Sequence, residues 1–156
     1  MQRITRMIIV ILFPVLTMAN TLVVKTVHSG DLVEFDSGFT VRLTGIVVPD
    51  TSTPIGLQAY DFVKRKIEGR RVKVITYTTN NLATGIVYGD DGRPFAQIIY
   101  GNEKNSEEWC TSINEELLKK GYARINERFL PQDLKFYKEI EHKAHEQKRG
   151  IWKNNE

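Results

Sequence analysis

Basic side chains gather in one short stretch of the sequence, where they could hold a row of phosphates. Six of the ten residues from 64 to 73 are basic: Lys64, Arg65, Lys66, Arg70, Arg71 and Lys73. Lys and Arg neutralise phosphates and release counterions, so such a stripe favours a polyanion partner such as nucleic acid. The alternative is an exposed helix end, because cations also suit the negative pole of a helix dipole.

Four further residues, Asp31, Arg42, Asp50 and Arg93, are charged groups of the types that acid–base or phosphate chemistry uses. Ordinary structural roles are open to them as well. Asp31 follows a glycine in a predicted hairpin turn, and Arg93 could be the solvated start of a strand. Arg42, which lies between two apolar residues, could be a structural arginine that pairs with a carboxylate such as Asp31.

Short runs rich in Val, Leu, Thr and Phe, separated by turns that contain Gly and Asp, predict the strands that must position these side chains. The sequence predicts strands over 21–27, 32–35, 39–46, 71–77, 84–88 and 95–100. The segment from Gly101 to Thr111 holds Trp109 and Cys110 and is predicted as an unusually long loop. Cys110 is the only cysteine, so the chain contains no internal disulfide.

Three helices are predicted from apolar residues that recur every three or four positions. The first runs from about Pro54 to Glu68, with the proline in its first turn. The second begins at Ser112, in capping-box spacing with Glu115, and the third carries its buried stripe over 134–144. Short strands with interspersed helices predict one domain, a small β-barrel packed against helices.

The first 19 residues predict a cleaved secretory signal peptide. Two arginines precede an apolar run of about a dozen residues, and Thr17-Met18-Ala19 suits signal peptidase cleavage before Asn20. A membrane anchor is the alternative, but the run contains Pro14 and is shorter than the roughly 20 residues that span a bilayer. We therefore expect an exported protein, periplasmic or extracellular, whose mature chain is 20–156.

The mature chain is expected to be almost neutral. The full sequence has 22 Lys and Arg against 19 Asp and Glu. Arg3 and Arg6 leave with the signal peptide, so 20 basic residues remain against the same 19 acidic ones. A polyanion partner must therefore be argued from where the cations lie and not from the pI near 9.0. The 41% of hydrophobic residues excludes a disordered tail.

A series of short motifs resembles the staphylococcal nuclease (thermonuclease) family. In order along the mature chain they are Ser29-Gly30-Asp31, Val41-Arg42-Leu43-Thr44-Gly45-Ile46, Pro49-Asp50, Gly56-Leu57-Gln58-Ala59-Tyr60-Asp61-Phe62, Gly92-Arg93-Pro94-Phe95-Ala96, Ile113-Asn114, Leu117-Leu118, Gly121-Tyr122-Ala123 and Gly150-Ile151-Trp152. Each motif is weak alone, but the whole series at compatible spacings is specific. The resemblance implies an OB-type five-stranded barrel with three helices and, in active members, a calcium-dependent phosphodiesterase that acts on DNA and RNA.

The resemblance also implies roles for the four charged residues. Arg42 and Arg93 match the catalytic arginines of the family, whose guanidinium forks stabilise phosphate oxygens. Asp31 matches its aspartate metal ligand. Asp50 lies where the family has a catalytic glutamate that orients or deprotonates the attacking water.

Several departures from the family pattern make the expected metal site degenerate. Val47 stands in place of a second carboxylate ligand, so calcium, which takes six to eight oxygens, is expected to bind weakly. Asp50 is shorter than glutamate by one methylene, about 1.5 Å, and misplacement by about 1 Å can cost about a hundredfold in rate. Ser29 replaces another aspartate. Asp90 and Asp91 stand where basic and tyrosine side chains often meet the substrate phosphate, and we expect them to repel DNA.

Two functions therefore compete. The first is an exported, metal-dependent phosphodiester hydrolase of DNA or RNA, of the endonuclease type, with weakened or lost activity. The second is a catalytically inactive module on the same fold that binds nucleic acid or another ligand, since fold and function separate easily. Arg42 and Arg93 favour the first function, whereas Val47 favours the second, so the sequence leaves open whether the protein is an enzyme. We expect a monomer with no membrane span after the leader is removed.

Overall fold

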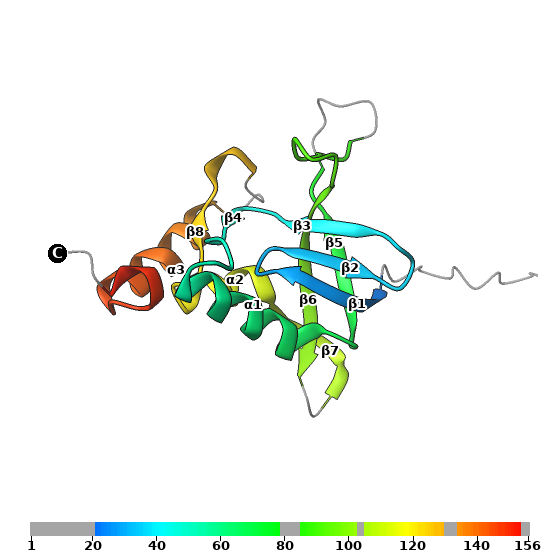
Figure 1. Ribbon diagram of the computed structural model, residues 1–156, viewed down its shortest axis with the longest axis horizontal. Coiled ribbons are helices and arrows are strands. Elements are labelled where there is room, and N and C mark those ends of the chain that lie inside the picture. The colour runs from blue at the N-terminus through cyan, green and yellow to red at the C-terminus, as the bar shows by residue number, and fades with distance from the viewer. Residues whose placement is uncertain (1–20, 79–84, 103–104, 130–133, 154–156) are drawn as a thin grey trace, which may run out of the picture.

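The computed structural model describes residues 21–78, 85–102, 105–129 and 134–153 of the chain. The predicted signal peptide, 1–19, lies outside these residues. Within them, five strands form a closed barrel, and three α-helices pack beside it (Figure 1). This architecture confirms the expected fold class, an OB-type barrel with three helices.

The barrel is closed by a pairing between strands that are far apart in the sequence. Its strands are β1 (Thr21–Ser29), β2 (Leu32–Phe35), β3 (Thr40–Leu43), β5 (Arg71–Thr76) and β6 (Phe95–Asn102). They are joined in the order β3-β2-β1-β5-β6, and each of these pairs is antiparallel. A parallel pairing of β3 with β6, in which Arg42 lies opposite Phe95, closes the barrel. The closure brings Arg42 close to the loop that carries Arg93.

The barrel interior is filled by alternate residues of its strands. Val33 and Phe35 on β2, and Val41 and Leu43 on β3, are fully buried. Arg42 lies between the two buried residues of β3, and 32% of its side chain is exposed. Because successive side chains of a strand point to opposite faces, the core that fixes β3 also directs Arg42 outward.

The helices begin where local capping signals place them. α1 (Pro54–Ile67) starts after Thr53, whose hydroxyl accepts a hydrogen bond from the Gly56 N–H at 3.0 Å. α2 (Ile113–Lys119) is capped by Ser112, as predicted, and α3 (Leu134–Glu146) follows. The short strands β4 (Ile46–Val47) and β8 (Arg124–Ile125) pair with each other, and two 3-10 helices are η1 (Glu127–Phe129) and η2 (Gly150–Trp152). None of the helices within the described ranges has the length and hydropathy needed to cross a membrane.

One buried amide ties α2 to the seam of the barrel. Asn114 is fully buried, and its side-chain nitrogen donates to the carbonyl of Thr44 at 2.9 Å and to that of Ala96 at 3.4 Å. Its side-chain oxygen accepts from the Ile98 N–H at 3.2 Å. Asn114 therefore holds the chain after β3 against β6, close to the residues of the candidate site.

The segment predicted as a long loop is instead a hairpin. β6 extends to Asn102, and β7 (Asn105–Ser112) pairs back along it, with Gly101 opposite Trp109. The hairpin projects beyond the barrel (Figure 1). The sequence of β7 is mostly polar and lacks the run of Val, Leu, Thr and Phe from which the other strands are predicted.

Two strand predictions also need correction. The strand predicted over 84–88 is reduced to isolated bridges between Thr78 and Ile86 and between Tyr88 and Pro94, and residue 84 lies outside the described part. The strand predicted over 39–46 ends at Leu43, because the chain leaves β3 there and Ile46 pairs with Ile125 of β8.

Candidate active site

Three of the predicted site residues meet at one end of the barrel. Asp31 lies in the turn between β1 and β2, and its carbonyl accepts a hydrogen bond from the Leu43 N–H at 2.8 Å. The Arg42 N–H donates to the carbonyl of Pro94 at 3.0 Å. The backbone of β3 is thus fixed between the turn that carries Asp31 and the loop that carries Arg93.

The guanidinium of Arg42 bridges two carboxylates. Its Nη1 lies 2.8 Å from Oδ2 of Asp31, and its Nη2 lies 2.6 Å from Oδ2 of Asp91. The Ser29 hydroxyl donates to the other oxygen of Asp31 at 2.6 Å. The pairing of Arg42 with Asp31 is the structural alternative that the sequence left open.

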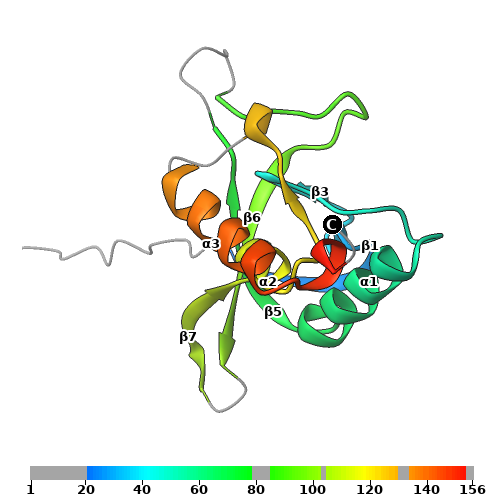
Figure 2. The ribbon, with the colours of Figure 1, turned by 90° about the vertical axis from the view of Figure 1, so that its left-hand side faces the viewer.

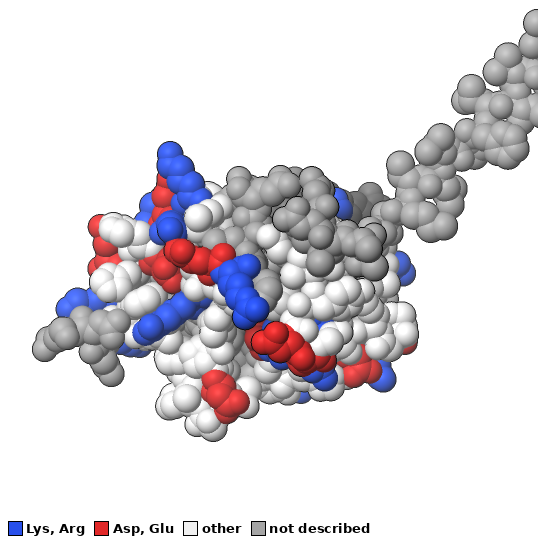
Figure 3. Space-filling view, turned by 90° about the horizontal axis from the view of Figure 1, so that it is seen from above, with Lys and Arg blue, Asp and Glu red and all other residues white. Residues whose placement is uncertain are grey.

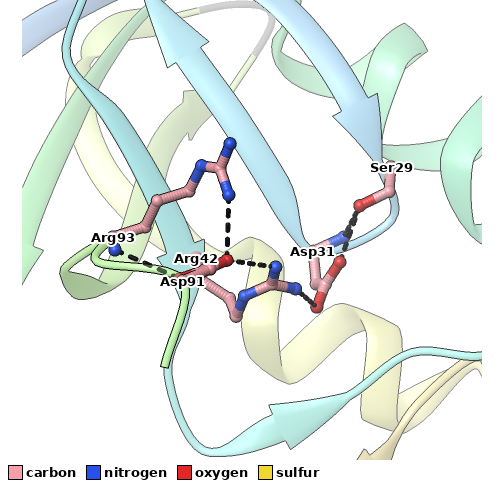
Figure 4. Close-up of polar contacts among 5 residues, drawn as sticks. All are labelled: Ser29, Asp31, Arg42, Asp91 and Arg93. Atoms are coloured by element: carbon pink, nitrogen blue, oxygen red, sulfur yellow. Dashed lines mark hydrogen bonds and ion pairs between the residues drawn. The ribbon is translucent and has the colours of Figure 1, made fainter. Parts of the chain in front are cut away.

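Asp91 is shared by the two arginines. Besides the contact with Arg42, its Oδ2 accepts from Nη1 of Arg93 at 3.0 Å, and its Oδ1 accepts from the Arg93 N–H at 3.1 Å. Figure 4 shows the carboxylate between the two guanidinium groups. Carboxylate and phosphate oxygens accept the same forked hydrogen bonds, so Asp91 occupies a position in which these arginines could hold a phosphate.

The charges of this cluster stabilise one another. The hydrogen bond from Arg42, helped by those from Arg93, lowers the pKa of Asp91 to about 2, although partial burial acts in the opposite direction. Partial burial acts to lower the pKa of Arg42, but the hydrogen bonds and charges of Asp91 and Asp31 outweigh it and raise that pKa. Asp91 is therefore ionised at neutral pH, and both arginines have an internal counterion.

A small hollow opens beside the cluster. It has a volume of about 250 Å³ and is lined by Arg42, Gly89, Asp90, Asp91 and Phe95. Clefts that bind whole small molecules typically measure roughly 300–1,000 Å³, so this one suits a single phosphate group with its ester neighbours. On the face of the molecule drawn in Figure 3, acidic and basic side chains are interspersed, and neither sign forms a continuous patch.

Asp50 is engaged elsewhere. It lies in the turn before α1, where its Oδ1 accepts from the Ser52 N–H at 2.8 Å and its carbonyl accepts from the Thr53 hydroxyl at 2.7 Å. The hydrogen bond from Ser52 lowers the pKa of Asp50. In the described part of the chain, Asp50 makes no hydrogen bond or ion pair with Asp31, Arg42 or Arg93.

The oxygen donors fit a calcium ion poorly. Both carboxylate oxygens of Asp31 already accept hydrogen bonds, one from Ser29 and one from Arg42. Val47, on β4, is 50% exposed and offers no side-chain oxygen. No group of three or more His, Cys, Asp or Glu that could hold a metal ion converges anywhere in the described residues. Calcium takes six to eight oxygens, and the two carboxylates of this cluster, Asp31 and Asp91, already accept hydrogen bonds from the arginines.

The basic stretch lies at the far end of α1 from Asp50. Lys64, Arg65 and Lys66 form the last turn of that 14-residue helix, which spans about 20 Å at 1.5 Å per residue. Lys64 lies 3.7 Å from a carboxylate oxygen of Glu68 and donates to the Tyr60 hydroxyl at 3.2 Å. These positions fit the helix-end interpretation of the three residues.

The other two predicted nucleic-acid contacts flank the start of β5. The main chain of Arg70 hydrogen-bonds with Val24 and Ile67, and Arg71 is exposed as the first residue of the strand. Neither takes part in the cluster around Arg42, so binding of nucleic acid at the basic stretch stays a prediction.

Comparisons with known proteins agree with the fold. A family model described as "Staphylococcal nuclease homologue" matches residues 40–154, a range that includes Arg42 and Arg93 and begins after Asp31. The "Staphylococcal-like nuclease CAN1" of Arabidopsis thaliana is 34% identical over 85 residues, which are 54% of this chain and 21% of the plant protein. The chain thus matches about a fifth of the length of that relative. Because the family model covers well over half of the sequence, the chain belongs to the staphylococcal nuclease homologue family.

Proposed function

We propose that this protein is an exported, thermonuclease-like protein that binds DNA or RNA and whose phosphodiester hydrolase activity is weak or lost. Membership of the family and the two adjacent arginines support a phosphodiester ligand. The observation that carries the loss of activity is the position of Asp91, whose Oδ2 accepts from both Arg42 and Arg93. A substrate phosphate would therefore compete with this carboxylate for both arginines.

The geometry of the two other carboxylates supports the same proposal. Asp50 would have to act as the base that activates water, but a carboxylate with a lowered pKa is a weaker base. Asp31 would have to hold a metal ion, but its oxygens are occupied by Ser29 and Arg42. The residues that remain suited to their family roles are Arg42 and Arg93, which can bind a phosphate and stabilise its charge.

A metal-dependent hydrolase is the second candidate. The observation that favours it is the convergence of Asp31, Arg42 and Arg93, three residues that match the site of active family members, within one hydrogen-bonded cluster. Because the donor set fits calcium poorly, we assign no reaction step to a metal.

A cleavage assay separates the two candidates. The mature chain from Asn20 is incubated with single-stranded DNA and with RNA in calcium, in manganese and in chelator, beside the double variant Val47→Asp/Asp50→Glu. We expect slow or undetectable cleavage by the natural chain and faster, metal-dependent cleavage by the double variant. Rapid metal-dependent cleavage by the natural chain, abolished by Arg42→Ala, would establish the hydrolase and refute the proposal.

Export, domain boundaries and oligomeric state complete the proposal. We propose that residues 1–19 are removed as a signal peptide and that 20–156 act as a monomeric domain in the periplasm or outside the cell. Expression of the full chain with its leader and N-terminal sequencing of the released protein tests this. A mature N-terminus at Asn20 is the expected result, and an uncleaved chain retained in the membrane fraction would contradict it.

A further inference from the structure

A basic pocket lies at the helical end of the molecule. It has a volume of about 500 Å³, and its walls include Gln58, Lys120, Tyr122, Lys148, Arg149 and Lys153. These residues come from α1, from the chain that follows α2 and from the turn around η2. Figure 2 faces this end and shows α1, α2 and η2 next to one another.

The positive charge of this pocket is not compensated in the way the candidate active site is. Its lining residues include four cations and no Asp or Glu. Within the described ranges, none of Lys120, Lys148, Arg149 and Lys153 forms an ion pair with a carboxylate. By contrast, Arg42 and Arg93 both lie against Asp91. Clustered charges of one sign attract ions of the other, so anions will gather in this pocket more readily than beside Asp91.

Tight backbone contacts fix the two turns that carry these cations. The Ile151 N–H donates to the carbonyl of Gly121 at 2.9 Å. Gly121 and Gly150 have φ of +67° and +51°, and a Cβ at Gly150 would lie 2.1 Å from the carbonyl oxygen of Gly121. Only glycine permits this approach. Nη1 of Arg149 also donates to the carbonyl of Lys119 at 2.8 Å. The pocket is thus preorganised, which reduces the entropy that a ligand must lose on binding.

The basic pocket borders the first turns of α1, the helix that follows Asp50. Gly56 packs directly on the carbonyl of Asp50, and Gln58, two residues further along the helix, lines the basic pocket. Tyr122 adds an aromatic ring to the wall, where its edge-to-face partner Phe62 lies at a centroid distance of 6.0 Å. The pocket therefore combines an aromatic ring with its four cations.

We propose that this basic pocket binds successive backbone phosphates of a single-stranded nucleic acid. Four cations on two separate turns suit several phosphates in a row better than one, and the hollow between them suits a strand better than the wide face of a duplex. This inference rests on the proposed function: it says where on the protein the nucleic-acid strand is bound. It also explains how a family member whose arginines are occupied by Asp91 could still bind its ligand.

The test compares two variants that remove the same charge. One is Lys120→Gln/Lys148→Gln/Lys153→Gln in the pocket, and the matched control is Lys135→Gln/Lys138→Gln/Lys143→Gln on α3. Binding of a fluorescently labelled single-stranded oligonucleotide to the mature chain is measured by anisotropy in chelator, over a range of salt concentrations.

For single strands each phosphate contact contributes about 0.7 to the slope of log K against log salt, so three lost contacts lower the slope by about 2. A rise in salt from about 50 to 200 mM then lowers the oligonucleotide affinity of the unaltered protein about twentyfold more than that of the pocket variant. We expect the control variant to keep the slope of the unaltered protein.

The possible results distinguish the two proposals. Equal slopes for the pocket variant and the control would overturn this inference and leave the proposed function standing, because the protein still binds the strand. No binding by the unaltered chain would remove the proposed function itself and this inference with it. If inorganic phosphate binds the pocket while oligonucleotide binding does not depend on it, the pocket is a small-anion site and the inference fails.

Discussion

Replacement of Asp91 by asparagine should make the protein slightly less stable and a better phosphate binder at the same time. The pKa of Asp91 falls from 3.8 to about 2, and a shift of one unit corresponds to about 1.4 kcal/mol, which sets an upper bound of about 2.5 kcal/mol. Because 29% of this side chain is exposed, solvent screening reduces the figure to about 1 kcal/mol. The melting temperature should fall by about 4 °C.

The contacts of Asp91 that stabilise the fold by about 1 kcal/mol should oppose the binding of a phosphate by the same amount. In Asp91→Asn, a phosphate no longer displaces a charged partner of Arg42 and Arg93, so affinity for a single-stranded oligonucleotide should rise about fivefold. Anisotropy titrations in chelator measure the affinity, and thermal unfolding measures the stability. Asp90→Asn is the matched control, since it removes the same charge from the same hollow and, in the described part of the chain, Asp90 has no ion pair.

An equal gain in affinity for Asp91→Asn and Asp90→Asn would refute competition between Asp91 and the phosphate, because the change in net charge alone would then explain the gain. A loss of affinity in Asp91→Asn would refute it more directly, since Asp91 would then position the arginines for the ligand and not compete with it.

Three further predictions follow from the same contacts. Asn114→Leu removes three hydrogen bonds of the buried amide, with the Ile98 N–H and the carbonyls of Thr44 and Ala96; at about 1 kcal/mol each, stability should fall by about 3 kcal/mol and the melting temperature by about 10 °C. The natural protein should lose about 1 kcal/mol of stability as the pH falls from about 4 to 2. The pKa of Asp91 is lower in the folded protein than in the unfolded chain, so the ionised carboxylate stabilises the fold above about pH 4, and this stabilisation is lost as the carboxylate is protonated. In Asp91→Asn this step should be absent from acid unfolding curves. Millimolar calcium should leave the melting temperature of the natural chain unchanged, whereas in Val47→Asp/Asp50→Glu a restored oxygen ligand should let calcium raise it.

The parts of the fold that the sequence predicts correctly are those with local causes. The helix predicted from Pro54 to Glu68 is found at Pro54–Ile67, because its proline, cap and apolar spacing all lie within one segment. The strand predicted over 32–35 is found unchanged. The hairpin at Gly101–Thr111 is not predicted, because β7 is mostly polar and lacks the apolar, β-branched composition that marks a strand.

The contacts of the candidate site likewise divide into local ones, which the sequence can predict, and long-range ones, which it cannot. Asp31 and Arg42 lie eleven residues apart on one hairpin, in which Leu32 pairs with Arg42, so their ion pair could be anticipated from the turn and the strands around it. Arg42 and Asp91 are 49 residues apart, and their contact exists only because β3 and β6 close the barrel. No pattern within either segment encodes that closure. The sequence predicted repulsion of DNA by Asp91, but the structure adds how it could act, as a counterion of both arginines.

The distinction between local and long-range contacts matters when charged residues are interpreted from their match to a family motif. Matching positions lead us to expect that Arg42 and Arg93 bind phosphate, but their capacity to bind depends on what already neutralises them, and here that is a carboxylate supplied by the loop before β6. Lys148 and Lys153 match no motif, yet within the described residues they face no carboxylate. Since attraction of a polyanion depends on uncompensated charge and not on residue type, its first contact on this protein should be the basic pocket and not the arginine pair.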